Sequence, residues 1–310
     1  LKKSGLDDAP DLVDVDAIEL YGQPPYSGFV DDPISLANGN FLLREGDLAL
    51  FGAAAPLSVV RAYNSRDPRT GAFGPGWTSL VDVALAIEGR RATFRGPDGG
   101  GSVFQQDDDG TWVGGGRRRQ HLVEVDDGYR LTEGHDRSWT FDADGVLTGF
   151  TADAARVTVQ RAPAAVRFTD ASSGRWVSYR LDPATGLALA ADSSDGRSAT
   201  YEHDDRGRLV AARRESGPVT YEHDDEGFLA SVVDGDGVTI CRNQYDPAGR
   251  VLTQVEQHGR ETRYEYRSDG VATVTATDGA PPNVMVHDRR GRLTAMIDGL
   301  GNTMRLAYDD

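Results

Sequence analysis

Tyr201-Glu-His-Asp-Asp-Arg-Gly207-Arg-Leu209 and Tyr221-Glu-His-Asp-Asp-Glu-Gly227-Phe-Leu229 are two copies of one motif, Tyr-x-His-Asp-x-x-Gly-x-Leu. The glycine of this motif recurs at positions 186, 207, 227, 249, 270 and 291, so successive copies lie 20 to 22 residues apart. A fixed period of this length is the signature of a protein built from stacked structural repeats. The second half of the chain is therefore predicted to be a repeat array.

Looser copies of the motif surround the two clean ones. Upstream, residues 141–147 and 179–187 are degenerate members, and the interval between them has room for one unrecognisable copy. Downstream, Tyr308-Asp-Asp310 opens a further copy. The repeat positions that we expect to build the array are Tyr201, His203, Asp204, Gly207, Leu209, Tyr221, His223, Asp224, Gly227, Leu229, Tyr245, Asp246, Gly249, Tyr264, Tyr266, Gly270, His287, Asp288, Gly291 and Leu293.

Each motif predicts a turn followed by a strand. In Asp-x-x-Gly the aspartate can accept a hydrogen bond from the backbone two residues on, and glycine adopts a positive φ without steric penalty. After the last motif glycine, Leu293, Ala295 and Ile297 recur at every second position, which indicates a half-buried strand with these three side chains on one face. One repeat is thus predicted to be a two-stranded antiparallel ribbon, with the Tyr or His before the turn on the apolar face.

Such hairpins must stack, because a single one is unstable in water and needs contacts from its neighbours. Adjacent strands twist by roughly 20° relative to one another, so a wide sheet of hairpins coils or curls. The composition agrees, since the chain holds 37 glycines and 14 prolines in 310 residues and no long segment has helical periodicity. The sequence predicts an all-β fold, a hairpin array that forms a curved, spiralling sheet with one apolar face.

The charge balance excludes several partners. The formal net charge is −16, from 49 acidic and 33 basic residues, so nucleic acids and anionic membranes would repel the chain. No run approaches the ~20 apolar residues that a membrane span needs, and no secretory signal is visible. Because the chain begins at Leu1 and stops inside a repeat, we expect it to be a piece of a longer polypeptide.

The residue types that carry catalysis or bind metals do not converge in the sequence. His203, His223 and His287 share one repeat position, four residues before the glycine, where Tyr245 and Tyr266 stand in sister copies. Because this position holds either histidine or tyrosine, we interpret its side chain as a packing and hydrogen-bonding element. Tyrosine in some of the copies would also interrupt a ladder of metal-binding histidines. We therefore expect no catalytic residue, no bound metal and no cofactor.

Three other features have a structural and a functional interpretation. Residues 107–110 and 234–237 cluster carboxylates in glycine-bearing loops that could hold calcium, but neither has the full spacing of a calcium loop, so solvated turns are favoured. Cys241, with no histidine before His258, is favoured as a buried small side chain over a nucleophile. The basic run Arg117-Arg-Arg119 is interpreted as a solvated loop, with a proteolytic processing site as the alternative.

A different segment precedes the repeats. It contains Asp32-Pro-Ile-Ser-Leu-Ala-Asn-Gly-Asn40-Phe41, then Arg61-Ala-Tyr-Asn-Ser65, then Phe73-Gly-Pro-Gly-Trp77. These three elements resemble, in this order, the domain that opens Rhs and YD-repeat proteins, and the motif copies downstream resemble the repeats of the same family. The positions that carry this likeness are Asp32, Pro33, Gly39, Asn40, Phe41, Tyr63, Asn64, Phe73, Gly74, Pro75, Gly76 and Trp77.

The resemblance implies a shell. Repeats of this family, like those of insecticidal toxin complexes and animal teneurins, look like long β-sheets that spiral into a hollow cocoon, which in bacterial members encloses a C-terminal toxin. We accordingly expect a segment of such a β-cocoon. Its expected parts are residues 1–30, a linker or docking strand, residues 31–135, an Rhs-type opening domain with a β meander, and residues 136–310, a YD-repeat array truncated at its C-terminal end.

The expected function is structural rather than enzymatic. A shell segment of a polymorphic toxin would encapsulate or sequester a toxin domain for delivery in bacterial competition, and it would be exported by a bacterial secretion system or displayed at the cell surface. Its expected partners are the remainder of the same polypeptide or a second shell-forming chain. The alternative is a cell-surface adhesion or carbohydrate-binding module, in which Trp139, Trp176 and Tyr179 would stack on sugars instead of being buried.

Overall fold

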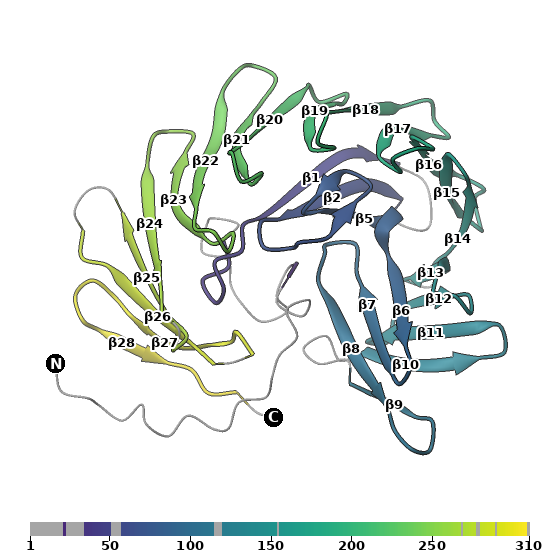
Figure 1. Ribbon diagram of the computed structural model, residues 1–310, viewed down its shortest axis with the longest axis horizontal. Coiled ribbons are helices and arrows are strands. Elements are labelled where there is room, and N and C mark those ends of the chain that lie inside the picture. Colours follow the sequence, from purple (N-terminus) through teal and green to yellow (C-terminus); the bar gives the residue numbers. More distant parts are fainter. Residues whose placement is uncertain are drawn as a thin grey trace.

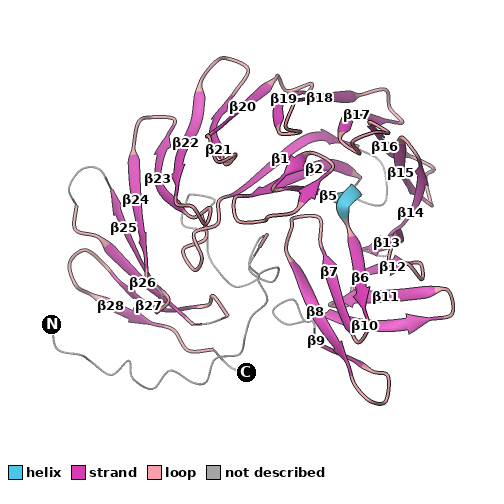
Figure 2. Cartoon of the chain, viewed as in Figure 1, coloured by secondary structure: helices cyan, strands magenta, loops and turns pink. Residues whose placement is uncertain are grey.

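The computed structural model describes residues 21–22, 34–50, 57–114, 120–153, 155–267, 269–276, 280–288 and 290–308. Over these ranges the chain is β-structure apart from loops and one short 3-10 helix, η2 (Leu80–Asp82), as Figure 2 shows. In this part of the chain, no helix has the length and apolar character to cross a membrane. The prediction of an all-β fold is confirmed.

Nineteen strands, β10 to β28, form one antiparallel sheet in which each strand pairs with its neighbours in sequence. The sheet is an arc in Figure 1, from β10 at the right over β18 to β28 at the left, so the predicted curved hairpin array is present. Its strands are β10 (Gln120–Val125), β11 (Gly128–Glu133), β12 (Arg137–Phe141), β13 (Leu147–Ala152), β14 (Ala155–Ala162), β15 (Ala165–Asp170), β16 (Trp176–Leu181), β17 (Ala188–Ser193), β18 (Ser198–His203), β19 (Leu209–Arg213), β20 (Val219–His223), β21 (Leu229–Val233), β22 (Thr239–Tyr245), β23 (Val251–Glu256), β24 (Glu261–Tyr266), β25 (Val271–Ala276), β26 (Asn283–His287), β27 (Leu293–Ile297) and β28 (Thr303–Arg305).

The segment before this sheet forms three smaller sheets. They are β1-β2-β5, the ribbon β3-β4 and the meander β6-β7-β8-β9. In Figure 1 the β1-β2-β5 sheet lies on the concave side of the arc, and the meander lies beside β10 and β11. The strands are β1 (Leu42–Ala49), β2 (Ser58–Asn64), β3 (Thr70–Gly71), β4 (Gly74–Pro75), β5 (Trp77–Ser79), β6 (Ala84–Glu88), β7 (Arg91–Arg95), β8 (Gly101–Gln106) and β9 (Trp112–Gly114).

The hydrophobic core lies between the opening segment and the concave, inner face of the arc. Phe73 and Trp77 from the opening segment and Tyr179 and Leu209 from the arc are all 0% exposed and belong to one continuous cluster of buried side chains. Charged and polar side chains alternate with these residues on the outer face. The sheet therefore has the predicted apolar face, and a separate part of the same chain covers most of it.

A β-bulge decides which side chains share the inner face. In the last full hairpin Met285 pairs with Met296, whereas His287 pairs with Leu293, so β27 contains one extra residue between these positions. The hairpins β18-β19, β20-β21 and β22-β23 show the same shift. The alternation predicted for residues 293–297 is therefore wrong, because the bulge turns Leu293 and Met296 to the same side.

The array is continuous through the interval that has no recognisable motif. Strands β14 and β15 lie between the copies at 141–147 and 179–187 and pair with β13 and β16, as two periods of the repeat require. The sheet also begins at β10, upstream of residue 136. The division into residues 1–30, 31–135 and 136–310 stays a prediction.

Candidate functional site: the seam between opening segment and repeats

The opening segment contacts the inner face of the repeats along one line, which we call the seam. The seam joins residues 39–77 to the strands and turns from β16 to β24. Backbone groups meet directly along it, since Ala188 N–H donates to the carbonyl of Ala72 at 2.6 Å and Val251 N–H donates to the carbonyl of Gly39 at 3.0 Å. The seam is the part of the molecule where both sets of sequence motifs come together.

A fully buried ion pair lies in the seam. Arg61 on β2 donates from Nε to Oδ2 of Asp47 on β1 at 2.6 Å, and both side chains are 0% exposed. Two repeat tyrosines complete the cluster: Arg61 Nη2 donates to Oη of Tyr221 at 2.7 Å, and Tyr201 Oη donates to Oδ2 of Asp47 at 2.9 Å. The motif tyrosines of the two clean repeats therefore bind the opening segment.

The surroundings of Arg61 keep it charged. Burial alone lowers the pKa of Arg61, but the neighbouring Tyr221 and Asp47 raise it, and the net pKa lies above its ordinary value. The guanidinium carbon lies 4.8 Å from the ring centre of Trp77 and 5.2 Å from that of Tyr221, and ring faces attract cations. Burial also raises the pKa of Tyr201, which therefore stays a neutral hydrogen-bond donor to Asp47.

Aromatic rings of the opening motifs fill the seam around this ion pair. Phe73 packs edge-on against Tyr201 with ring centres 4.7 Å apart, and Trp77 packs edge-on against Tyr221 at 5.5 Å. Tyr63 contacts Trp77, and its Oη accepts a hydrogen bond from the backbone N–H of Leu229 at 3.0 Å. Edge-on ring pairs of this kind contribute about 0.5–1.5 kcal/mol beyond the area they bury.

The glycine at position 74 lets two backbones approach closely. Its φ is +101°, and a Cβ there would lie 2.5 Å from the carbonyl oxygen of Gly207, the glycine of a clean repeat. An L side chain would be strained in this conformation and would also collide with the neighbouring backbone. Only glycine therefore fits at this contact between the Phe-Gly-Pro-Gly-Trp element and the array.

The Asn-Gly-Asn-Phe and Tyr-Asn-Ser elements are tied to each other and to a third repeat. Asn40 Nδ2 donates to Asn64 Oδ1 at 2.8 Å, and Asn64 Nδ2 donates to the carbonyl of Asp98 at 2.9 Å. Ser65 Oγ donates to the carbonyl of Gly249 at 2.7 Å. These opening-motif residues thus hold their own loops in shape and connect them to the array. Asp32 and Pro33 lie outside the described residues.

The aspartate of each motif closes its own turn. Asp204 Oδ1 accepts a hydrogen bond from the backbone N–H of Arg208, while its Oδ2 accepts one from Nε of the same arginine at 2.7 Å. Asp246 and Arg250 form the same clasp at 2.6 Å, and residues 288–292 repeat it at 2.7 Å. Burial alone would raise the pKa of Asp246, but these bonds to Arg250 outweigh it, so the net pKa is lowered and the carboxylate stays ionised.

The residue after the motif glycine contacts the next copy. It meets the position four residues before the following glycine, which we call the slot and which holds His203, His223, Tyr245, Tyr266 or His287. Three pairs of this kind are Phe228 against Tyr245 at 5.2 Å, Arg250 over Tyr266 at 5.4 Å and Arg292 over Tyr308 at 4.8 Å. Tyr245 Oη also donates to the carbonyl of Leu229 at 2.8 Å. The slot therefore couples consecutive repeats.

The slot histidines are partly buried in the array. Burial lowers the pKa of His203 and of His287, and a backbone hydrogen bond only partly offsets this effect in each case. Burial, with a further contribution from the positive charge of Arg208, lowers the pKa of His223 to about 4. Nε2 of His203 and Nδ1 of His287 are buried and meet no hydrogen-bond partner within the described ranges.

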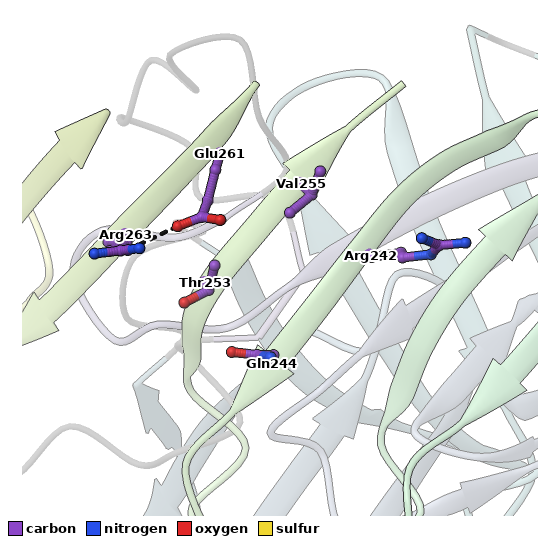
Figure 3. A pocket seen from close by; sticks show the side chains of 6 residues that line it. All are labelled: Arg242, Gln244, Thr253, Val255, Glu261 and Arg263. Carbon is purple, nitrogen blue, oxygen red and sulfur yellow. Dashed lines mark hydrogen bonds and ion pairs between the residues drawn. The ribbon is translucent and has the colours of Figure 1, made fainter. Parts of the chain in front are cut away.

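The outer face of β22 to β24 carries an open polar groove of about 430 Å³, shown in Figure 3. Its lining residues are Arg242, Gln244, Thr253, Val255, Glu261 and Arg263. Thr253 and Val255 on the middle strand are shorter than their cross-strand neighbours, which leaves the depression. Arg263 donates to Glu261 at 2.7 Å, so this acidic side chain is engaged in an ion pair rather than placed as a free base.

The remaining sequence candidates for ligand binding lie in turns or in the core. Asp109 and Asp234 accept hydrogen bonds from backbone N–H groups of their own turns, and Cys241 is buried. Across the described ranges, no group of three or more His, Cys, Asp or Glu residues is placed to hold a metal ion. Arg117-Arg-Arg119 lies outside the described residues.

Most of the aromatic side chains that were candidates for stacking on sugars are buried. Trp139 is 4% exposed and Tyr179 is 0% exposed, and both belong to the core. Trp176 is partly exposed, and the guanidinium of Arg167 lies 4.2 Å from its ring centre. These three residues thus do not form a continuous exposed strip.

Sequence reasoning did not single out Arg61 and Asp47 as a pair, because 14 residues separate them and the motif tyrosines they bind lie more than 150 residues away. The Asp-Arg clasps, in contrast, could have been predicted from the sequence. An arginine directly follows the motif glycine at positions 208, 250 and 292, four residues after an aspartate in each case. That spacing places opposite charges across one turn.

Two family models match the chain, one in the opening segment and one in the repeats that it contacts. Residues 31–104 match a family described as a domain of unknown function (DUF6531), and residues 203–239 match the family described as RHS Repeat. The chain therefore contains an RHS repeat at residues 203–239. The resemblance predicted from the two sets of motifs is therefore confirmed.

Solved structures show only distant likeness to this chain. The crystal structure of TcdB2-TccC3 without its hypervariable C-terminal region is 12% identical over 81% of this chain and 16% of that chain, with a TM-score of 0.40. The Photorhabdus luminescens Tc holotoxin pore is also 12% identical over 81% of this chain and 16% of that chain, with a TM-score of 0.38. The chain thus spans about a sixth of the length of these matches. No curated protein matches it.

Proposed function

We propose that this RHS-repeat chain is a wall segment of an exported toxin shell and that the complete shell encloses a C-terminal toxin domain. The observation that carries the proposal is the continuous 19-stranded arc, whose inner face is apolar and is closed over β12 to β24 by the opening segment. A wall needs such an uninterrupted sheet, because every internal strand then has both its edges paired.

The two ends of the arc support the same proposal. The meander β6 to β9 packs on the first strands, since Phe94 contacts Trp139 and Phe141 and the Leu85 N–H donates to the carbonyl of Gly145. The opening segment would therefore close one end of the shell as a plug. At the other end, β28 is the last strand of the sheet, and further repeats of the same polypeptide or of a second shell-forming chain would pair with it.

The described chemistry supports a container better than an enzyme. The buried ionisable groups at the seam are engaged with one another, and the outer groove holds an Arg-Glu pair on an open surface. The exposed aromatic strip that carbohydrate adhesion would require is not formed by Trp139, Trp176 and Tyr179. We propose that the complete shell isolates a cargo by excluding solvent-borne partners.

The test is limited proteolysis of the natural full-length polypeptide, followed by mass analysis of the fragments. We expect a compact particle whose C-terminal segment resists protease concentrations that digest the same segment expressed alone. The isolated segment is the control, because it shows that resistance comes from enclosure. Rapid digestion of the C-terminal segment in the full-length particle would overturn the enclosure proposal and would favour an adhesion module.

A further inference from the structure

The slot residues divide the seam into two chemically different parts. His203 ends β18 and His223 ends β20, whereas Tyr245 ends β22 and Tyr266 ends β24. All four side chains are partly buried at equivalent places in the repeat. A tyrosine stays neutral throughout the physiological pH range, but a histidine gains a positive charge within it. The slots at β18 and β20 can therefore respond to acid, and those at β22 and β24 cannot.

The surroundings of His203 favour the neutral form of its imidazole ring. It forms a backbone hydrogen bond with Phe73 of the opening segment, and its buried Nε2 meets no partner in the part of the chain that the structure describes. A proton on this nitrogen would place an unsatisfied charged donor against the seam. The charged groups that act on this ring are Asp204, on its own turn, and Arg61, across the seam. Arg61 opposes a second positive charge there.

His223 has a second reason to stay neutral. The guanidinium of Arg208 belongs to the clasp of the preceding repeat and acts on His223 as a nearby positive charge, with Asp204 as the opposing carboxylate. Asp204 is already bound to Arg208 at 2.7 Å, so it has little capacity left to compensate a charged imidazole. Protonation of His223 would thus add a like charge inside a partly buried cluster.

We propose that the slot histidines make the seam acid-labile, so that mildly acidic conditions loosen β18 to β21 from the opening segment while the tyrosine-slot strands β22 to β24 keep their protection. The proposal concerns the seam itself and holds whether or not the shell encloses a toxin. The physical element is a pair of partly buried rings: His203, whose buried Nε2 meets no partner in the described ranges and which faces Arg61, and His223, which faces Arg208.

The direction follows from proton linkage. The folded-state pKa values of His203 and His223 lie below the unfolded value of ~6.5, so the unfolded segment binds more protons as the pH falls. Stability from these groups is complete near neutral pH and is lost between about pH 7 and the folded pKa, which is about 4 for His223. At about pH 5.5 His223 alone shifts the local opening equilibrium about tenfold.

Hydrogen exchange measured by mass spectrometry at about pH 7.5 and about pH 5.5, corrected for intrinsic rates, tests the proposal within one molecule. Peptides from β18 to β21 should lose at least about tenfold more protection on acidification than peptides from β22 to β24. The aspartate clasps occur in both groups of strands, so carboxylate titration contributes to both. Equal changes in the two groups would overturn the proposal.

Variants that copy the sister repeats provide the second test. The double variant His203→Tyr/His223→Tyr places in these slots the residue that the chain already uses at Tyr245 and Tyr266. We expect this variant to remove the extra acid sensitivity of β18 to β21, and the exposed control His258→Tyr to retain it. If the double variant folds and keeps the wild-type pH dependence, the proposal is wrong. If it does not fold, the hydrogen-exchange comparison of β18 to β21 with β22 to β24 in the wild-type chain tests the proposal.

Discussion

Repeats beneath the opening segment and repeats beyond it share one motif but differ in burial. Leu209 and Leu229 occupy the same motif position and are 0% exposed, whereas Leu293, the equivalent residue in the last copy, is only partly buried. Farther on, Met304 is 45% exposed. The motif thus specifies the hairpin in both regions. Burial of its apolar face depends on whether another segment covers it.

The turn chemistry is the same on both sides of this boundary. The Arg-Asp clasp measures 2.7 Å at Arg208 and Asp204, under the opening segment, and 2.7 Å at Arg292 and Asp288, beyond it. Local interactions therefore form without the cover, while the long-range contacts exist only where the cover lies. The difference in stability between the regions should come from the core and the seam rather than from the turns.

The largest expected effect comes from removing the buried cation. Arg61→Ala removes the closest charged partner of buried Asp47 and leaves it with Tyr201 and the more distant Arg214, which should lower the free energy of unfolding by about 3–5 kcal/mol. Urea unfolding followed by tryptophan fluorescence measures it. Arg213→Ala is the matched control, because Arg213 forms an exposed pair with Glu202 that is worth at most about 1 kcal/mol. Equal losses for both variants would refute a central role for the ion pair.

The comparison between covered and uncovered repeats can be tested at one motif position. Leu209→Ala should cost about 2–5 kcal/mol, because it opens a cavity in a fully packed site. Leu293→Ala should cost clearly less, since its side chain is already partly exposed and water can fill the space. Chemical denaturation of both variants gives the difference. Similar costs would mean that the cover contributes little to this position.

A smaller effect is expected from the close backbone approach in the seam. Gly74→Ala meets both a φ of +101° and the carbonyl oxygen of Gly207, whereas Gly301→Ala meets only a φ of +88° in open space. The left-handed conformation alone costs about 1–2 kcal/mol, so Gly301→Ala should stay within that range and Gly74→Ala should exceed it. Thermal unfolding compares the two. A smaller loss for Gly74→Ala would contradict the packing seen at the seam.

The smallest effect should come from the clasps and should be equal in the two regions. Arg250→Ala and Arg292→Ala each remove a partly exposed arginine that binds its own turn aspartate and covers a tyrosine of the next copy. Each should cost no more than about 1 kcal/mol, and added salt should reduce the cost. Unfolding midpoints at low and high salt measure this. A much larger effect at Arg250 would show that the clasp also supports the seam.

Much of the fold could be predicted from local patterns. The 20- to 22-residue period located the repeats, and Asp-x-x-Gly located their turns, because both depend on residues that are close in sequence. The strand faces were less predictable. A bulge near the slot shifts Leu293 relative to Met296, and simple alternation does not contain that information.

The amino-acid sequence by itself determined the β-hairpin repeats, the aspartate turns and the curvature of their sheet, because these follow from backbone preferences within a few residues and from strand twist. Only the tertiary structure decided that Arg61 and Asp47 bind Tyr201 and Tyr221, and that the opening segment lies on the inner face of the arc. Contacts over more than 150 residues depend on how the whole sheet curves, which no local pattern records.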